Sequence, residues 1–137
     1  MSTSEETGTP PAGVGGVPPR VLNLSAALER VDGLWRPHVV ADLNGQQIKL
    51  ARIQGAFDWH AHPDEDEAFL VVRGRMRLEF DNGVRELGEG DLCVVPRGTR
   101  HRPVADDECH IVLFEPAGTV NTGDAPGSRT VRELPRL

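Results

Sequence analysis

Short stretches of alternating apolar and polar residues, each ended by Gly, Pro, Asn or Asp, dominate the chain from residue 38 to residue 114. They recur at intervals of roughly 8–12 residues, which is typical of an all-β sandwich or barrel. Asn44-Gly45 predicts a two-residue hairpin turn, and after it Ile48 and Leu50 alternate with Lys49 at the period of a strand. The gaps are too short for crossover helices, so we expect mainly antiparallel pairing. The predicted strands cover residues 38–43, 46–54, 57–62, 67–73, 75–80, 84–87, 92–95, 100–104 and 109–114.

The two ends of the chain lack this alternation. Residues 1–19 are rich in Ser, Thr, Glu, Gly and Pro, and such a composition buries too little apolar surface to offset the entropy of ordering. We expect a disordered tail over 1–19, one barrel domain over 20–116, and a C-terminal loop or arm over 117–137, in which 130–134 could add an edge strand. One short helix is expected between Val21 and Val31, with Ser25 as its N-cap and with Leu24, Leu28 and Val31 on its buried face.

Charge and cysteine content disfavour several classes of protein. The 137 residues carry a formal net charge of −6 and their Lys and Arg residues are scattered, so we expect neither a nucleic-acid nor a membrane partner. We expect no signal peptide, because the first residues have neither a basic region nor an apolar core. Cys93 and Cys109 form no Cys-x-x-Cys pair, which favours reduced, buried thiols and a cytoplasmic location.

Three of the five histidines lie between residues 60 and 101, together with a carboxylate that begins an apolar strand. His60 and His62 are two residues apart, so in a strand their side chains share one face and can meet one ion. Glu67 precedes Phe-Leu-Val-Val, and an ionised Glu at the start of a buried strand is unfavourable unless it is paired or bound to a cation. His101 follows a Pro-x-Gly turn that can direct its side chain toward the same point.

This pattern resembles the two sequence motifs of the cupin superfamily. The first motif is matched by Gly55, His60, His62, Glu67 and Gly74, and the second by Gly90, Pro96, Gly98 and His101. Two positions depart from the family pattern: Gly55 lies one residue closer to His60 than usual, and Ala105 replaces an Asn that is not a ligand. The motifs span residues 55–105 and the strand pattern extends the resemblance over about 35–115. The chain looks most like the small stand-alone cupins described as sugar-isomerase-like.

The resemblance implies a cupin-type double-stranded β-helix, or jelly-roll barrel, that holds a metal ion. His60, His62, Glu67 and His101 occupy the positions of the family's metal ligands. The acidic ligand is not Glu65 or Asp66, because Glu67 alone leaves six residues before the motif glycine. Three imidazoles and one carboxylate suit one divalent transition metal, Fe, Mn, Ni, Co, Cu or Zn, rather than Ca or Mg. A six-coordinate ion would keep two positions open for water, O₂ or a bidentate substrate, whereas four ligands fill tetrahedral Zn.

The first functional expectation is a metal-dependent enzyme that acts on a small organic substrate, either anionic or oxygen-chelating. Dioxygenase, isomerase, decarboxylase and cyclase reactions all occur among cupins, and the absence of tyrosine disfavours the cupin lyases that use a tyrosine base. The alternatives are a non-catalytic, metal-stabilised module that binds or senses a small ligand, and a structural barrel with an incidental metal. Further candidates are Asp58 and His110 for catalysis, and Phe69, Val71 and Arg52 for substrate binding. Exposed edge strands predict a homodimer, which is also common among cupins.

Overall fold

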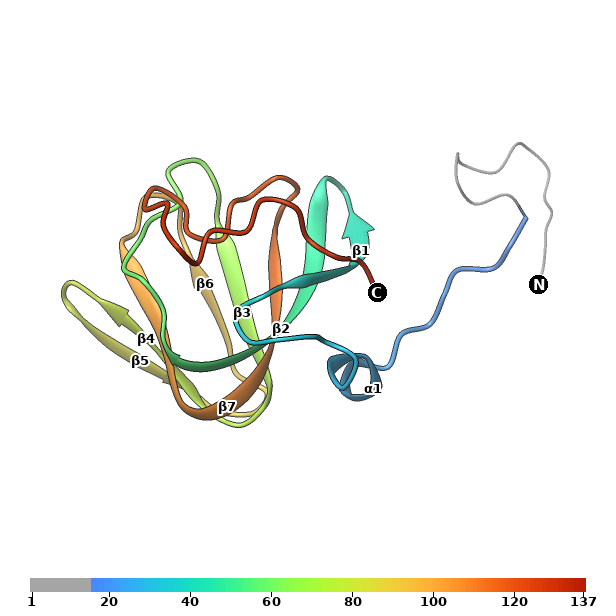
Figure 1. Cartoon of the computed structure of the whole chain (residues 1–137), viewed down its shortest axis with the longest axis horizontal. Coiled ribbons are helices and arrows are strands. Elements are labelled where there is room, and N and C mark those ends of the chain that lie inside the picture. The colour runs from blue at the N-terminus through green and yellow to red at the C-terminus, as the bar shows by residue number, and fades with distance from the viewer. Residues whose placement is uncertain (1–15) are drawn as a thin grey trace.

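A computed structural model describes residues 16–137, so most of the predicted N-terminal tail lies outside the described residues. Within 16–137, seven strands form one sheet that curves around an interior, and one short helix lies against its outer side (Figure 1). The elements are α1 (Leu24–Leu28), β1 (His38–Leu43), β2 (Gln46–Ala56), β3 (Glu67–Arg73), β4 (Met76–Phe80), β5 (Gly83–Leu87), β6 (Leu92–Val95) and β7 (His101–Pro116). None of the helical turns in this range is long and apolar enough to cross a membrane.

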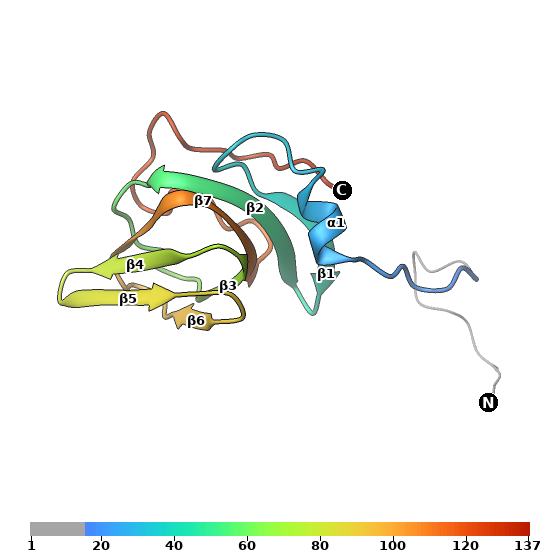
Figure 2. The ribbon, with the colours of Figure 1, turned by 90° about the horizontal axis from the view of Figure 1, so that it is seen from below.

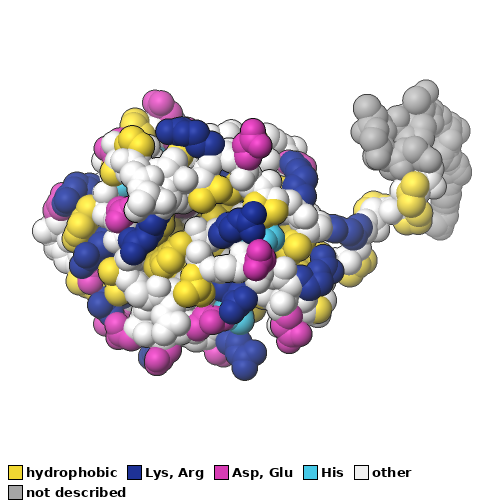
Figure 3. Space-filling model, viewed as in Figure 1, with side chains coloured by type: hydrophobic (Ala, Val, Ile, Leu, Met, Phe, Trp, Pro, Cys, Tyr) yellow, Lys and Arg dark blue, Asp and Glu magenta, His cyan; other side chains and the backbone are white. Residues whose placement is uncertain are grey.

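Strand β7 is the centre of the sheet. It pairs with β2 along one edge, and with β4 and then β3 along the other. Strand β1 continues the sheet beyond β2, β6 continues it beyond β3, and β5 pairs with β4. Every one of these pairs is antiparallel, as predicted, and Figure 2 shows how the strands bend around the interior. On the face seen in Figure 3, acidic and basic side chains are interspersed rather than gathered by sign.

The hairpin between β1 and β2 has the predicted turn. Asn44 and Gly45 have φ values of 53° and 80°, the left-handed conformations that a type I′ turn requires. The helix is shorter than predicted and Ser25 is not its cap. Asn23, whose backbone is extended, accepts a hydrogen bond from the Ala26 amide at 2.9 Å through its side-chain oxygen. The predicted buried face is confirmed, because Leu28 and its neighbours pack against β2 and β7.

Two of the predicted strand boundaries were wrong. The strands predicted over 100–104 and 109–114 are one strand, β7, which begins at His101. Its exposed residues 106–108 form a bulge where the register with β2 shifts. Residues 57–62 form no strand of their own, because their backbone groups bind several different segments. Within them His60 makes a single antiparallel bridge to His101. Residues 130–134 likewise lie in an arm without a strand, which ends in a bridge between Arg136 and Val39 of β1.

Two apolar layers cover the two faces of the sheet. The inner layer fills the barrel and includes Phe69, Val71, Ile111 and Leu113, whereas the outer layer joins α1 to β2 and β7. Strand β2 alternates as expected, with Ile48 and Leu50 on the outer side. Lys49 nevertheless faces inward with Ala51 and Ile53, and its side chain is only 1% exposed. The barrel interior therefore contains a lysine, which must find a partner there.

Candidate metal centre

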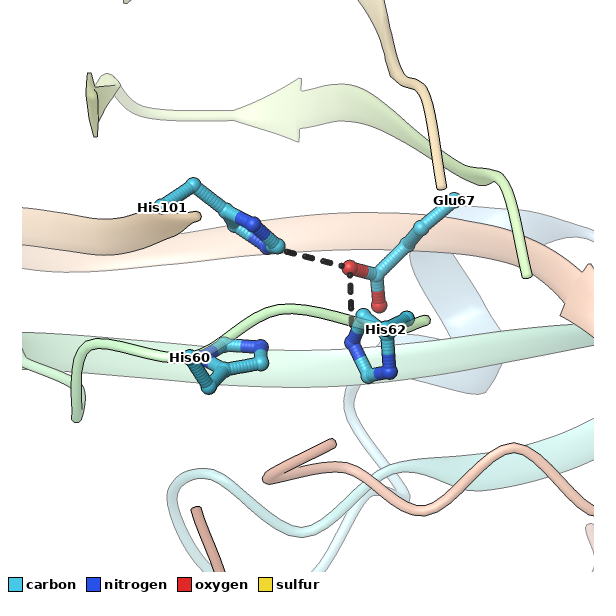
Figure 4. A group of neighbouring side chains, drawn as sticks. All are labelled: His60, His62, Glu67 and His101. Atoms are coloured by element: carbon cyan, nitrogen blue, oxygen red, sulfur yellow. Dashed lines mark ion pairs between the residues drawn. The ribbon is translucent and has the colours of Figure 1, made fainter. Parts of the chain in front are cut away.

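His60, His62, Glu67 and His101 meet inside the barrel (Figure 4). The first two come from the segment between β2 and β3, Glu67 is the first residue of β3, and His101 is the first residue of β7. All four are buried, with exposed fractions of 5% or less, and one ligand atom from each lies within 4.8 Å of the others. Two parts of the sequence, residues 60–67 and His101, thus supply one compact set of donor atoms.

The spacing of these atoms suits one small cation. Glu67 Oε1 lies 3.4 Å from His62 Nε2 and 3.4 Å from His101 Nε2. Atoms that each sit about 2.1 Å from a shared ion are about 3.0–3.5 Å apart when they are adjacent ligands. The rings of His60 and His101 have centroids 4.4 Å apart, and the ligand atom of His60 lies within 4.8 Å of the other three.

Two of the imidazoles are oriented by the same local device. The Nδ1–H of His60 donates to the carbonyl of Asp58 at 2.8 Å, and the Nδ1–H of His101 donates to the carbonyl of Thr99 at 2.9 Å. A histidine that donates through one ring nitrogen presents the lone pair of the other, which is how metal-binding histidines are usually fixed. Neither ring nitrogen of His62 has a hydrogen-bond partner within residues 16–137.

Several buried polar atoms at this centre lack a partner in the described part of the chain. They are both ring nitrogens of His62, Nε2 of His101 and Oε1 of Glu67. A buried polar atom without a partner is unfavourable by about 1–3 kcal/mol. A divalent cation among these atoms would give a partner to one atom of each of His62, Glu67 and His101, so the donor set fits a metal ion.

The ionisation states at the centre also suit metal binding. Burial lowers the pKa of His60 to about 4, although its hydrogen bond to the Asp58 carbonyl opposes the shift, so this ring is neutral near pH 7. Burial raises the pKa of Glu67, but the adjacent His101 and His62 rings lower it by more, so that the pKa lies well below its usual range. Neutral imidazole and ionised carboxylate are the forms that bind metals.

Glu115 is a second buried carboxylate at this centre, and sequence analysis did not select it. Its Oε2 accepts a 2.6 Å hydrogen bond from Lys49 Nζ, and its Oε1 has no partner within the described residues. Burial and the nearby Glu67 carboxylate raise the pKa of Glu115, although Lys49 opposes them. The available signal was its parity in β7, where Ile111, Leu113 and Glu115 fall on the same face.

A cavity of about 40 Å³ adjoins the centre. Its walls are mainly apolar, and its lining includes Trp35, Phe57, Phe69, His60, Glu67 and Glu115. A buried water needs about 10–15 Å³ of such volume, so the cavity has room for a few non-hydrogen atoms. Trp35 adopts an unusual φ of 60°, and its indole N–H donates to the Gln54 carbonyl at 2.8 Å. This hydrogen bond holds the indole as one wall of the cavity.

Of the further candidates, Phe69 lines the cavity, whereas Val71 lies in the inner layer away from it. The side chain of Asp58 forms an ion pair with Arg129 at 3.1 Å, outside the cavity lining.

Arg52 and His110 both lie on the outer side of the sheet, where they share one partner. Glu108 accepts from Arg52 Nε at 2.8 Å and lies 2.7 Å from His110 Nε2. Neither residue lines the cavity, because each occupies the outward position of its strand. The structure therefore gives neither side chain access to a molecule beside the four ligands.

Comparisons with known proteins identify the class of protein that this fold and site define. The sequence model of the Cupin domain family, Cupin_2, matches residues 48–115. The protein YdbB of Bacillus subtilis (strain 168), described as uncharacterized, is 33% identical over 84 residues, which cover 61% of this chain and 74% of YdbB. The chain belongs to the Cupin_2 domain family.

Solved structures agree. The crystal structure of a cupin-2 domain containing protein from Shewanella frigidimarina NCIMB 400 is 36% identical and matches with a TM-score of 0.69, over 70% of this chain and 94% of that one. Protein NMB1881 from Neisseria meningitidis is 30% identical with a TM-score of 0.66, over 72% and 100% of the two chains. The predicted cupin fold is thereby confirmed.

Proposed function

We propose that His60, His62, Glu67 and His101 bind one divalent transition metal, and that the protein is a metal-dependent enzyme for a small organic substrate. The observation that carries this proposal is that one donor atom from each of these four buried residues lies within 4.8 Å of the others. Those of His62, Glu67 and His101 have no hydrogen-bond partner among residues 16–137. When bound, the ion would supply Lewis acidity and, if it is redox-active, a site for O₂. Fe, Mn, Ni and Co suit this role better than Zn, because a six-coordinate ion keeps positions open.

The charges around the centre favour an anionic ligand. Three neutral imidazoles and one carboxylate leave a divalent ion with a net charge of about +1. Lys49 and Glu115 form an ion pair beside it and add little net charge. A carboxylate, an enolate or a pair of adjacent oxygens would complement this charge and the open positions.

The cavity walls define what else a substrate meets. Phe57 and Phe69 form apolar walls of the cavity beside the centre, and the Trp35 ring packs on Phe57 with centroids 4.8 Å apart. Glu115 is an ionisable side chain of the lining besides the candidate ligands His60 and Glu67, and Lys49 fixes it in place. A compact substrate with an apolar body and adjacent oxygens therefore fits best.

The proposal is tested by removing metal with a chelator and reloading the protein without oxygen. Each of Fe(II), Mn(II), Ni(II), Co(II) and Zn(II) is then assayed against a panel of small hydroxy acids, keto acids and diols, with oxygen uptake and product formation as readouts. We expect turnover with at least one octahedral metal and none with His101→Gln. Panel members that bind without turnover would instead identify a non-catalytic ligand-binding module. Failure of every metal to bind would refute both.

A further inference from the structure

The segment that carries His60 and His62 lies outside the strands, so its backbone polar groups need partners from elsewhere. His60 and His101 exchange two backbone hydrogen bonds, with N–O distances of 3.0 and 2.8 Å. The carbonyl of His62 accepts from the Gly98 amide at 2.8 Å. These contacts fix the two histidines, and the amide and carbonyl of Ala61 between them bind a different part of the chain.

That part is the C-terminal arm, through Asp124. The Ala61 amide donates to Asp124 Oδ1 at 2.8 Å, and the Asp124 amide donates to the Ala61 carbonyl at 2.9 Å. The two residues are 63 positions apart. Together the bonds replace one rung of an antiparallel ladder, with a side-chain oxygen in place of a backbone carbonyl. Asp124 therefore does for this segment what a neighbouring strand does elsewhere in the sheet.

The turn that carries Asp124 is shaped for this close approach. Gly123 has a φ of +55°, and a Cβ there would lie 2.2 Å from the Ala61 oxygen and 3.2 Å from His60 Cδ2. Thr122 is fully buried, and its hydroxyl lies 2.6 Å from that of Thr130, which anchors the turn to the rest of the arm. Figure 1 shows the arm, in red, crossing one end of the barrel.

A second contact ties the arm to the same segment. The Arg129 guanidinium donates to the Ala56 carbonyl at 3.0 Å and to Asp58 Oδ1 at 3.1 Å. The carbonyl of Asp58 in turn accepts from the His60 ring. The arm thus holds the histidine segment at two points, near Asp58 and at Ala61, and all of these arm residues follow the family-matched region, which ends at residue 115.

We propose that Asp124 is a positioning residue of the metal centre, which sets the separation and direction of the His60 and His62 rings by holding the peptide between them. This inference rests on the proposed metal binding. Removing an outer hydrogen-bond partner of a metal ligand typically lowers metal affinity by about 10–100-fold. Asp124 acts one step further out, through the backbone, so we expect about a tenfold loss.

The test compares Asp124→Ala, which loses the acceptor, with Asp124→Asn, which keeps an oxygen at the same place. Metal dissociation constants are measured by competition with a chelator, and the Cu(II) electron paramagnetic resonance spectrum reports ligand geometry. We expect Asp124→Ala to bind about tenfold more weakly with an altered spectrum, and Asp124→Asn to restore both. Asp91→Ala is the matched control, because Asp91 Oδ2 accepts from the Gly88 amide at 2.8 Å, in a turn that contains none of the four metal ligands.

The outcomes separate this inference from the proposed function. If the unaltered chain binds metal and Asp124→Ala matches it in affinity and spectrum, the positioning role is refuted while metal binding stands. An equal loss in Asp91→Ala would assign the effect to general destabilisation and also refute it. If Asp124→Ala fails to fold, hydrogen exchange of the unaltered chain with and without metal tests the inference instead. Metal loading must then protect residues 119–126 together with 57–66, and protection of 57–66 alone would contradict the inference.

Discussion

Lys49 Nζ lies 2.6 Å from Glu115 Oε2 inside the barrel, and both side chains are at most 2% exposed. In the register of β2 and β7, Lys49 faces Leu113 and Gln47 faces Glu115, so the ion pair is diagonal across the two strands. Its carboxylate adjoins Glu67, which makes the pair a neighbour of the metal centre. Because both side chains are buried, each has the other as its charge partner in place of water.

Replacing Lys49 with methionine should therefore destabilise the protein strongly. Removal of one partner from a buried ion pair costs about 3–5 kcal/mol, because the other charge is left without compensation. Urea unfolding of Lys49→Met measures the loss. The double variant Lys49→Met/Glu115→Leu should recover most of it, since an apolar pair avoids the isolated charge. A Lys49→Met variant as stable as the unaltered chain would contradict this prediction.

Gly74, a glycine of the first cupin motif, should not tolerate a side chain. Its φ is +90°, and a Cβ there would lie 3.1 Å from the Glu108 carbonyl oxygen and 3.3 Å from Cys109 Cα. Both neighbours are backbone of the β7 bulge, so they cannot move aside easily. We expect Gly74→Ala to lower the free energy of unfolding by about 1–3 kcal/mol.

Gly127→Ala is the matched control for this substitution, because a Cβ at Gly127 has open space around it and the residue has no positive φ. Thermal unfolding of the two variants side by side checks the prediction. Equal melting temperatures would contradict it.

The motif offsets predicted which four side chains meet at the centre, because each ligand is tied to a local turn or strand start. The same reasoning explains Asn44-Gly45, whose conformation depends on two residues alone. Features that depend on contacts between residues distant in the sequence were not predicted. Lysine is a residue type that usually faces solvent, and Glu115 stands just before Pro116 at the end of a strand. Neither Lys49 nor Glu115 therefore predicted the buried pair.

Residues 57–62 were mistaken for a strand because their alternation is real but their backbone partners are scattered through the fold. The role of Asp124 depends on a contact across 63 residues that no local pattern encodes. The homodimer and the cytoplasmic location stay predictions.

The ion pair between Glu108 and Arg52 should make stability depend on acid pH. Hydrogen bonds from Arg52 and His110 lower the pKa of Glu108 from its usual 4.5 to about 2. Because the pKa is lower in the folded state, this group stabilises the fold above about pH 4.5, and that contribution is lost as pH falls toward 2. The melting temperature of Glu108→Gln should fall less steeply with decreasing pH over this range than that of the unaltered chain. The difference should shrink in 1 M salt, since the Glu108 side chain is 36% exposed and salt can screen it. The same dependence of melting temperature on pH in the two proteins would contradict the prediction.

The most direct test of the metal centre is the metal content of stripped and reloaded protein, measured by inductively coupled plasma mass spectrometry. We predict one divalent transition-metal ion per chain for the unaltered protein. The same content is expected for His110→Gln, whose histidine lies on the outer side of the sheet beside Glu108. His101→Gln and Glu67→Gln should retain almost none, because each replaces one of the four buried ligands with a neutral, weakly binding amide. An unaltered chain that takes up no ion, or a His101→Gln variant that retains as much metal as the His110→Gln control, would contradict the account.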